Sequence, residues 1–216
     1  MVFRGVIFDL DGVLVKTDEL HFQSWQRVTG EEGIYFDYAI NDRLRGISRP
    51  DSLRIVLERA PRLYTPHEQA ALLDRKQSIF RQLLETLTPA DLLPGALETV
   101  VELRRRGLKT AVGSSSKNTA FIIARLGLGR HFDAVVDGND ITRSKPDPEV
   151  FLLTAQRLGL EPAECLVVED ALAGVESARR AGMAVFGIGP PEKLPGVARV
   201  APDLAHVTVD QLLGAV

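Results

Sequence analysis

The chain has 216 residues, of which 45% are hydrophobic and 25% are charged, and its formal net charge is -3. This composition is typical of soluble globular proteins and argues against a disordered, fibrous or membrane protein. Lysine and arginine are scattered along the sequence rather than clustered, which argues against binding to nucleic acid or to an anionic membrane.

The first part of the sequence predicts one short strand followed by helices. Residues 5–8, Gly-Val-Ile-Phe, have the length and the branched apolar side chains of a buried strand. Apolar residues then recur at helical spacing over about residues 17–29 and around residues 53–60, and a long helix is predicted at 66–87. Because this stretch has no convincing strand pattern, we predict a small all-helical unit.

From residue 93 onward, predicted helices alternate with short apolar runs. The predicted strands are residues 109–113, 133–136, 165–168 and 184–188, and the predicted helices lie near 95–106, 117–127, 147–158 and 171–181. This alternation is typical of an α/β fold with a parallel sheet. We therefore predict a doubly wound, Rossmann-like parallel-sheet core of residues 1–15 and 92–216, with an all-helical cap domain inserted at 16–91.

Two carboxylates, Asp9 and Asp11, follow the first predicted strand, and Gly12 comes directly after them. The glycine frees the backbone to turn, so that both side chains can face one pocket. One carboxylate could then attack phosphorus while the other moves a proton. The pair alone is equally compatible with a capped turn, and attack on an anion would require a cation and positive side chains from elsewhere.

Polar residues that could meet this requirement follow three later predicted strands, at the sheet edge where ligands bind. Ser114 could donate a hydrogen bond to a phosphoryl oxygen, and Lys145 could offset developing negative charge. Glu169 and Asp170 would repel Asp9 unless a divalent cation lay among them, and an all-oxygen ligand set favours Mg²⁺ over zinc. Each group alone is also explained by a helix cap or a solvated lysine, but their order along the chain predicts one phosphoryl-transfer site.

These segments resemble the four motifs of the haloacid-dehalogenase-like phosphotransferase superfamily, and the match spans nearly the whole chain. The matching segments are Phe8–Val13, Ser114–Asn118, Ser144–Pro146 and Glu169–Gly174. The helical insertion after the first motif is similar to the cap of the β-phosphoglucomutase group within this superfamily. We therefore expect the fold and the chemistry of that group.

The resemblance implies a role for each residue at the predicted sheet edge. Asp9 would be the phosphorylated nucleophile and Asp11 the general acid and base, with Ser114 and Lys145 as the other catalytic residues. Four groups would serve Mg²⁺, the implied cofactor. They are Asp9, the main-chain carbonyl of Asp11, Glu169 and Asp170.

The resemblance also implies substrate contacts, most of them in the cap and in the loop after residue 113. The implied substrate-binding residues are Asp11, His21, Trp25, Gly46, Ile47, Ser48, Arg49, Lys76, Ser115, Ser116, Lys117 and Asn118. A site for a second phosphate is expected around Gly46–Arg49, because Ser48 and Asp51 have the spacing of a helix cap and an arginine can bind phosphate through two hydrogen bonds. A capped helix with a solvent-facing arginine, and packing roles for His21 and Trp25, remain structural alternatives.

Four positions depart from the usual pattern of the group. Lys16 replaces an acid near the predicted hinge, Arg45 stands where lysine is frequent, and Gly113 and Ser115 stand where alanines are common. None of these changes removes a catalytic atom. They bear on the hinge and on sugar preference.

The activity implied is that of a Mg²⁺-dependent phosphomutase. It would interconvert β-D-glucose 1-phosphate and glucose 6-phosphate through a phospho-aspartate at Asp9 and a glucose 1,6-bisphosphate intermediate. A sugar-phosphate phosphatase of the same superfamily, with the same nucleophile, is the first alternative. A non-catalytic binding protein on an enzyme scaffold is the second.

The remaining expectations concern location and partners. Cys165 is the single cysteine and cannot form an intramolecular disulfide, which is typical of a reducing compartment. We find neither an apolar run long enough to span a membrane nor a leader sequence before the first strand. We expect a cytoplasmic monomer whose partners are a small phosphorylated sugar and a sugar bisphosphate, with no nucleic acid and no membrane.

Overall fold

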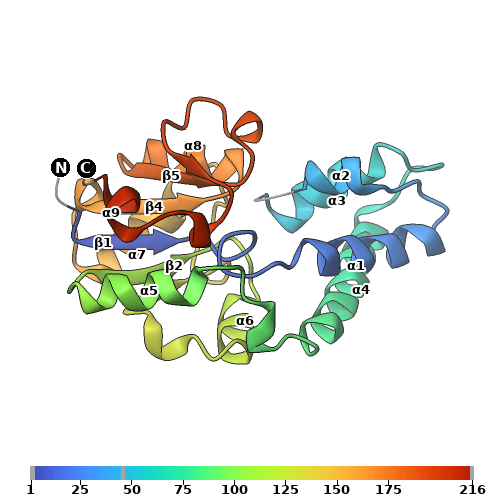
Figure 1. Ribbon diagram of the computed structural model, residues 1–216. Coiled ribbons are helices and arrows are strands. Elements are labelled where there is room, and N and C mark those ends of the chain that lie inside the picture. The colour runs from blue at the N-terminus through green and yellow to red at the C-terminus, as the bar shows by residue number, and fades with distance from the viewer. Residues whose placement is uncertain (1–2, 45–46, 215–216) are drawn as a thin grey trace. The chain divides into compact units, whose positions relative to one another are not determined.

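The computed structural model describes residues 3–44 and 47–214. The chain forms two compact units (Figure 1). One consists of Met1–Lys16 and Thr88–Val216, and the other is Thr17–Leu87. None of the helices within the described residues is both long enough and apolar enough to cross a membrane.

The first unit, which we call the core, is built on a six-stranded sheet in which every neighbouring pair of strands is parallel. The strands are β1 (Gly5–Phe8), β2 (Lys109–Gly113), β3 (Ala134–Val136), β4 (Cys165–Glu169), β5 (Ala184–Ile188) and β6 (Val200–Ala201). Their order is β3-β2-β1-β4-β5-β6, so the direction of winding reverses between β1 and β4. In such sheets a ligand site forms beyond the carboxyl ends of the strands at this reversal.

Helices cover both faces of the sheet, which confirms the doubly wound prediction. They are α5 (Ala96–Arg105), α6 (Thr119–Arg125), α7 (Glu149–Leu158), α8 (Leu172–Arg180) and α9 (Val209–Leu213). Phe151 of α7 and Ala178 of α8 pack with Ile7 in one apolar cluster on one face of the sheet. Figure 1 shows α5 and α9 in front of the sheet, and these two helices contact each other.

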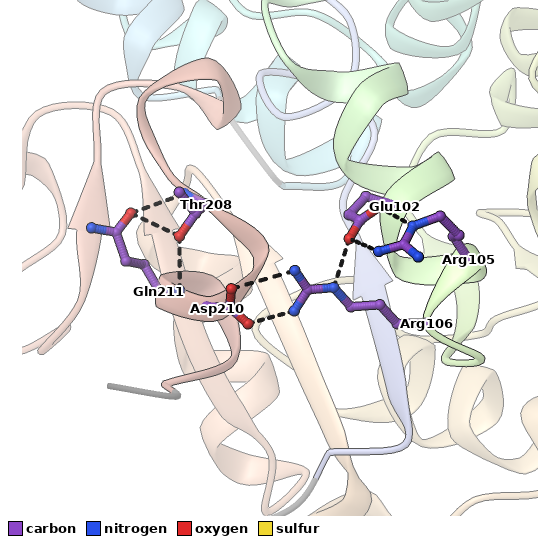
Figure 2. Close-up of polar contacts among 6 residues, drawn as sticks. All are labelled: Glu102, Arg105, Arg106, Thr208, Asp210 and Gln211. Carbon is purple, nitrogen blue, oxygen red and sulfur yellow. Dashed lines mark hydrogen bonds and ion pairs between the residues drawn. The ribbon is translucent and has the colours of Figure 1, made fainter.

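The short helix α9 is fixed to the core by polar contacts (Figure 2). Thr208 caps the helix together with Gln211, and Arg106 at the end of α5 forms an ion pair with Asp210. Arg106 also pairs with Glu102, at 2.7 Å between Nε and Oε1. The sequence pattern did not predict α9 or β6, because five and two residues are too few to show a period.

The second unit, the cap, contains helices joined by turns and loops, and its described residues 17–44 and 47–87 include no strand, as predicted. Its helices are α1 (Asp18–Glu31), α2 (Tyr38–Asp42), α3 (Arg49–Leu57) and α4 (Pro66–Leu84). They share an apolar cluster that includes Trp25, Leu53 and Leu72. Thr65 and Glu68 form a capping box that satisfies the first N–H groups of α4.

The chain leaves and re-enters the core through a small paired stem. Val15 forms an antiparallel bridge with Leu92, and the N–H of Leu93 donates to the carbonyl of Leu14 at 3.0 Å. These contacts close the insertion point with main-chain hydrogen bonds that belong to the core itself. The turn before the stem uses Gly12, which has a φ of 85°.

Gly95, which precedes α5, provides a test of close packing in the core. Its φ is +78°, and a Cβ there would lie 2.3 Å from the main chain of Leu204 and Ala205. Gly107 has a similar φ of +80° with nothing within 4 Å of its Cβ position. We expect Gly95→Ala to lower the free energy of unfolding in urea by about 3 kcal/mol and Gly107→Ala by only about 1 kcal/mol. Equal losses would show that the close contact has no energetic weight.

Candidate active site

The site begins where β1 ends. Asp9 is the residue directly after the strand, and its N–H donates to the carbonyl of Val168 in β4 at 2.9 Å. This bond places Asp9 at the reversal of the strand order, where its side chain is buried. The next residues turn away from the sheet, with the N–H of Gly12 bonded to the carbonyl of Val15 at 2.8 Å.

Lys145 meets Asp9 in the interior of the core, although 136 positions separate them in the sequence. Its Nζ lies 2.6 Å from Asp9 Oδ1 and 2.7 Å from Glu169 Oε1. The same ammonium group lies 4.7 Å above the centre of the Phe151 ring. Lys145, Asp9 and Glu169 are all buried, so these ion pairs are shielded from water and from salt.

The charges in this group alter one another's protonation. Burial raises the pKa of Asp9 to about 7, with Glu169 and Asp11 adding to the rise and Lys145 opposing it. Burial acts in the opposite direction on Lys145, but the carboxylates of Asp9 and Glu169 raise the pKa of Lys145 above its ordinary value. The lysine is therefore charged at neutral pH. Asp9, with a pKa of about 7, is present there in both its protonated and its ionised form.

The acidic residues fit a divalent cation. Carboxylate oxygens of Asp9, Glu169 and Asp170 all lie within 4.8 Å of one another. Three carboxylates against the single charge of Lys145 leave an excess of negative charge in a poorly solvated place, which a cation would offset. Oxygen donors of this kind suit Mg²⁺. Both oxygens of Glu169 also accept hydrogen bonds from protein groups, Lys145 on one and the N–H of Ala171 on the other.

Gly174 in α8 is what allows Glu169 to adopt this position. A Cβ on Gly174 would lie 1.7 Å from Glu169 Oε1 and 2.0 Å from its Cδ. Any side chain at position 174 would therefore displace the carboxylate that holds Lys145. In the sequence, Gly174 ends the motif Glu169–Gly174, and its spacing five residues after the glutamate is the signal of this contact.

The loop after β2 carries the predicted phosphate-binding residues. Ser114 is buried, and its N–H donates to the carbonyl of Val136 at 3.1 Å. Its Oγ accepts the N–H of Ser116 at 3.1 Å, which leaves the hydroxyl proton for a phosphoryl oxygen. Lys117 and Asn118 lie in the turn before α6, because this helix begins at Thr119, two residues later than predicted.

Two departures from the usual pattern of the group have structural partners. Ser115 Oγ accepts the N–H of Lys145 at 3.4 Å, so this hydroxyl supports the lysine loop. A Cβ on Gly113 would lie 3.1 Å from both Phe151 Cδ1 and Thr154 Oγ1. Helix α7 thus packs so closely on β2 that an alanine at 113 would force its neighbours to shift.

The cap contains a cluster of basic side chains. Lys76 Nζ lies 3.0 Å from His21 Nδ1, and the His21 ring stacks on Phe80 with 4.0 Å between centroids. Lys76 is 2% exposed, which is unusual for a lysine. Burial, followed by the charges of Lys76 and Arg49, lowers the pKa of His21 well below its ordinary value. His21 is therefore neutral near pH 7, and the cluster suits an anion.

Other predicted substrate residues of the cap are placed as follows. Ser48 caps α3, with Asp51 N–H donating to its Oγ at 3.2 Å, and Arg49 begins the helix half-buried. Trp25 is 2% exposed within the apolar cluster of the cap, which agrees with the alternative that this side chain has a packing role. Ile47 is in a bend next to Ser48, whereas Gly46 lies outside the described residues.

Comparison with known proteins decides the family. A sequence model of haloacid dehalogenase-like hydrolases matches residues 3–182. The chain belongs to this family. It is 38% identical to a β-phosphoglucomutase of Bacillus subtilis, over 97% of this chain and 93% of the relative. The resemblance seen in the sequence is thereby confirmed, and the chain is an enzyme of the haloacid dehalogenase-like family.

Two further members of the family are also similar. A fructose-1-phosphate phosphatase of Escherichia coli is 33% identical over 84% of this chain and 94% of its own length. The crystal structure of a β-phosphoglucomutase from Clostridium difficile has a TM-score of 0.93 and 29% identity, and the match covers 99% of this chain and 97% of that one. The family is therefore secure, whereas its named activities differ among the relatives.

The raised pKa of Asp9 predicts that Mg²⁺ binding depends on pH. A proton and the cation compete for the same carboxylate, so affinity is lost as the pH falls below about 7. We expect the dissociation constant for Mg²⁺ to be about tenfold higher at pH 6 than at pH 8, as measured by titration calorimetry or by the rise in melting temperature. Asp9→Asn should abolish this dependence, and equal affinities at the two pH values in the unaltered protein would contradict the prediction.

Gly174→Ala tests whether the Glu169 carboxylate must hold Lys145. The added methyl group would displace Glu169, so we expect hydrolysis of p-nitrophenyl phosphate to fall about 100-fold. Gly30→Ala is the matched control, because Gly30 is also helical and nothing lies within 4 Å of its Cβ position. A variant with unchanged activity would show that this position of Glu169 is not required.

Proposed function

We propose that this enzyme is a Mg²⁺-dependent β-phosphoglucomutase that interconverts β-D-glucose 1-phosphate and glucose 6-phosphate. The observation that carries the proposal is the buried contact between Lys145 and Asp9, 2.6 Å long, beside two more carboxylates that fit Mg²⁺. The 38% identity to a β-phosphoglucomutase along 97% of the chain supports the mutase activity in particular.

In the proposed reaction Asp9 receives and returns a phosphoryl group. A carboxylate oxygen of Asp9 attacks phosphorus, the bond from phosphorus to the sugar oxygen breaks, and Asp11 gives a proton to that oxygen. Lys145 favours the ionised form of Asp9 in spite of its burial, and with the Ser114 hydroxyl it offsets charge on the phosphoryl oxygens. Mg²⁺ held by Asp9, Asp170 and neighbouring groups would supply further positive charge.

The catalytic cycle starts from phospho-Asp9, which first transfers its phosphoryl group to the sugar. Asp11 takes the proton from the C6 hydroxyl of β-D-glucose 1-phosphate, whose oxygen attacks phospho-Asp9 and gives the 1,6-bisphosphate. After the bisphosphate has turned round, Asp9 accepts the C1 phosphoryl group, and glucose 6-phosphate leaves. The phosphoenzyme is regenerated, so phosphate and protons balance over the cycle.

A mutase must hold a second phosphate while Asp9 reacts with the first. We propose that Arg49, with the basic environment of Lys76 and His21, contributes to this second site, together with Ser116, Lys117 and Asn118. We also propose that residues 16–91 act as a substrate-enclosing cap, for which the compact unit Thr17–Leu87 is the structural support. The remaining implied contacts, and the cytoplasmic, monomeric state, stay predictions.

A sugar-phosphate phosphatase is the second candidate, favoured by the 33% identity to a fructose-1-phosphate phosphatase. It would use the same nucleophile, Asp9, and the same proton carrier, Asp11. The two activities differ only in the acceptor of the phosphoryl group, which is water in the phosphatase and a sugar hydroxyl in the mutase. Product analysis therefore separates them.

Arg49→Ala tests the mutase proposal directly. Loss of the guanidinium should reduce formation of glucose 6-phosphate about 100-fold, because the bisphosphate intermediate is no longer held while its C1 phosphoryl group is transferred to Asp9. Slow release of inorganic phosphate from phospho-Asp9 should stay within about threefold, since Arg49 is not proposed to touch the reacting group. The measurement is ³¹P NMR with Mg²⁺, β-glucose 1-phosphate and a glucose bisphosphate primer.

Arg54→Ala is the matched control for this experiment, because Arg54 lies on the same helix and its side chain is 76% exposed. It should leave both rates unchanged. Equal loss of both activities in Arg49→Ala would contradict a role in holding the second phosphate. Accumulation of inorganic phosphate without glucose 6-phosphate in the unaltered enzyme would reject the mutase and favour the phosphatase.

A further inference from the structure

We propose that the loop Asp137–Asp140, which follows β3, positions the segment Ser116–Asn118 and thereby sets the affinity of the enzyme for its sugar phosphate. The inference rests on the proposed function, which assigns this segment to the second phosphate. Residues of the β3 loop are not proposed to touch substrate. They are positioning residues that act through the neighbouring loop.

Two hydrogen bonds join the β3 loop, Asp137–Asp140, to main-chain carbonyl groups of Ser116–Asn118, which we call the substrate segment. The N–H of Gly138 donates to the carbonyl of Ser116 at 3.1 Å, and Asn139 Nδ2 donates to the carbonyl of Lys117 at 3.1 Å. These contacts begin just beyond Val136, whose carbonyl already binds the N–H of Ser114. The β3 loop therefore continues the sheet pairing into the substrate segment.

The approach of the two loops is closer than a side chain would allow. A Cβ on Gly138 would lie 2.3 Å from the carbonyl oxygen of Ser115 and 3.1 Å from the main-chain nitrogen of Lys117. Both of these atoms belong to the backbone, so they cannot move aside as a flexible side chain would. A glycine at 138 is thus a condition of the observed position of the Ser115–Lys117 backbone.

The β3 loop is itself held in place. Asp137 is buried, and its Oδ1 accepts the N–H of Asn139 at 2.7 Å, while Asp140 Oδ2 accepts the N–H of Asp137 at 3.0 Å. Arg157 of α7 then pairs with Asp140, at 2.6 Å between Nη2 and Oδ1, and donates to the carbonyl of Val135. These bonds connect the substrate segment through the loop to a helix of the core.

The direction of the peptide groups gives this support a chemical consequence. In a trans peptide the C=O and the following N–H point in opposite directions. Because the carbonyl of Ser116 is bonded to the β3 loop, the N–H of Lys117 is turned away from that loop. The N–H of Asn118 donates to Ser116 Oγ at 3.2 Å, so it holds the hydroxyl of Ser116 in place. An anion can bind an N–H group such as that of Lys117, so a shift of the β3 loop would change the contact with the phosphate.

The test compares Gly138→Ala with Gly129→Ala, using β-glucose 1-phosphate as substrate. Gly129 is exposed, and nothing lies within 4 Å of its Cβ position. We expect Gly138→Ala to raise KM for β-glucose 1-phosphate at least tenfold, because the substrate segment must move. Phosphorylation of Asp9 by acetyl phosphate, which has no second phosphate, should stay within about twofold in both variants.

Asn139→Ala keeps the inference testable if Gly138→Ala fails to fold. The Asn139 side chain is exposed, so its removal loses the hydrogen bond to Lys117 with little effect on packing. We expect KM to rise about fivefold, the loss typical of one hydrogen bond, with an unchanged melting temperature. A KM equal to that of Gly129→Ala, or a parallel fall in the acetyl phosphate reaction, would overturn the inference.

Failure of the proposed function gives a different result. An unaltered enzyme that hydrolyses β-glucose 1-phosphate without forming glucose 6-phosphate is not a mutase. In that case inhibition of the hydrolysis by glucose 1,6-bisphosphate, which carries a second phosphate, is compared across the same three variants. Weaker inhibition in Gly138→Ala and Asn139→Ala then supports the positioning role, and equal inhibition in all three overturns it.

Discussion

The candidate active site depends on keeping Lys145 charged inside the core. Removing a charge from water costs several kcal/mol, so a buried ammonium group persists only if carboxylates pair with it closely. Asp9 and Glu169 both do so, within 2.7 Å. Each neighbouring feature serves this arrangement: β1 and β4 bring the two acids side by side, Gly174 leaves space for Glu169, and the hydroxyl of Ser115 supports the main chain of the lysine.

Much of the fold could be predicted because its strands are buried on both faces. Runs such as Gly5–Phe8 and Cys165–Val168 are uniformly apolar, and such runs between helical patterns indicate a parallel sheet. Short elements carry no such signal. Helix α9 has a local capping box of Thr208 and Gln211 but only five residues, and its ion pair with Arg106, which follows α5, is a tertiary contact that no local pattern contains.

The same contrast holds within the site. The proximity of Asp9, Lys145 and Glu169 could be predicted because charged residues at strand ends, and in the loops that follow strands, indicate a site at one edge of the sheet. The support given by Gly138 and Asn139 was not, because it acts on main-chain carbonyls that every residue possesses. Gly113 appeared in the sequence as an unexplained departure, and only the closeness of Phe151 and Thr154 gives it a reason. The chemistry of a side chain can be inferred from the sequence, whereas the distance between two packed elements is known only from the structure.

The paired stem of Val15 and Leu92 has a consequence for how such enzymes diversify. Since the stem closes with hydrogen bonds of its own, the parallel sheet has no need of any particular insert to complete it. Natural selection can exchange or reshape residues 17–87 as a module without disturbing the buried group of Asp9, Lys145 and Glu169. Exchange of such a module would produce relatives that share a core and have different activities, and the relatives of this chain include a mutase and a phosphatase.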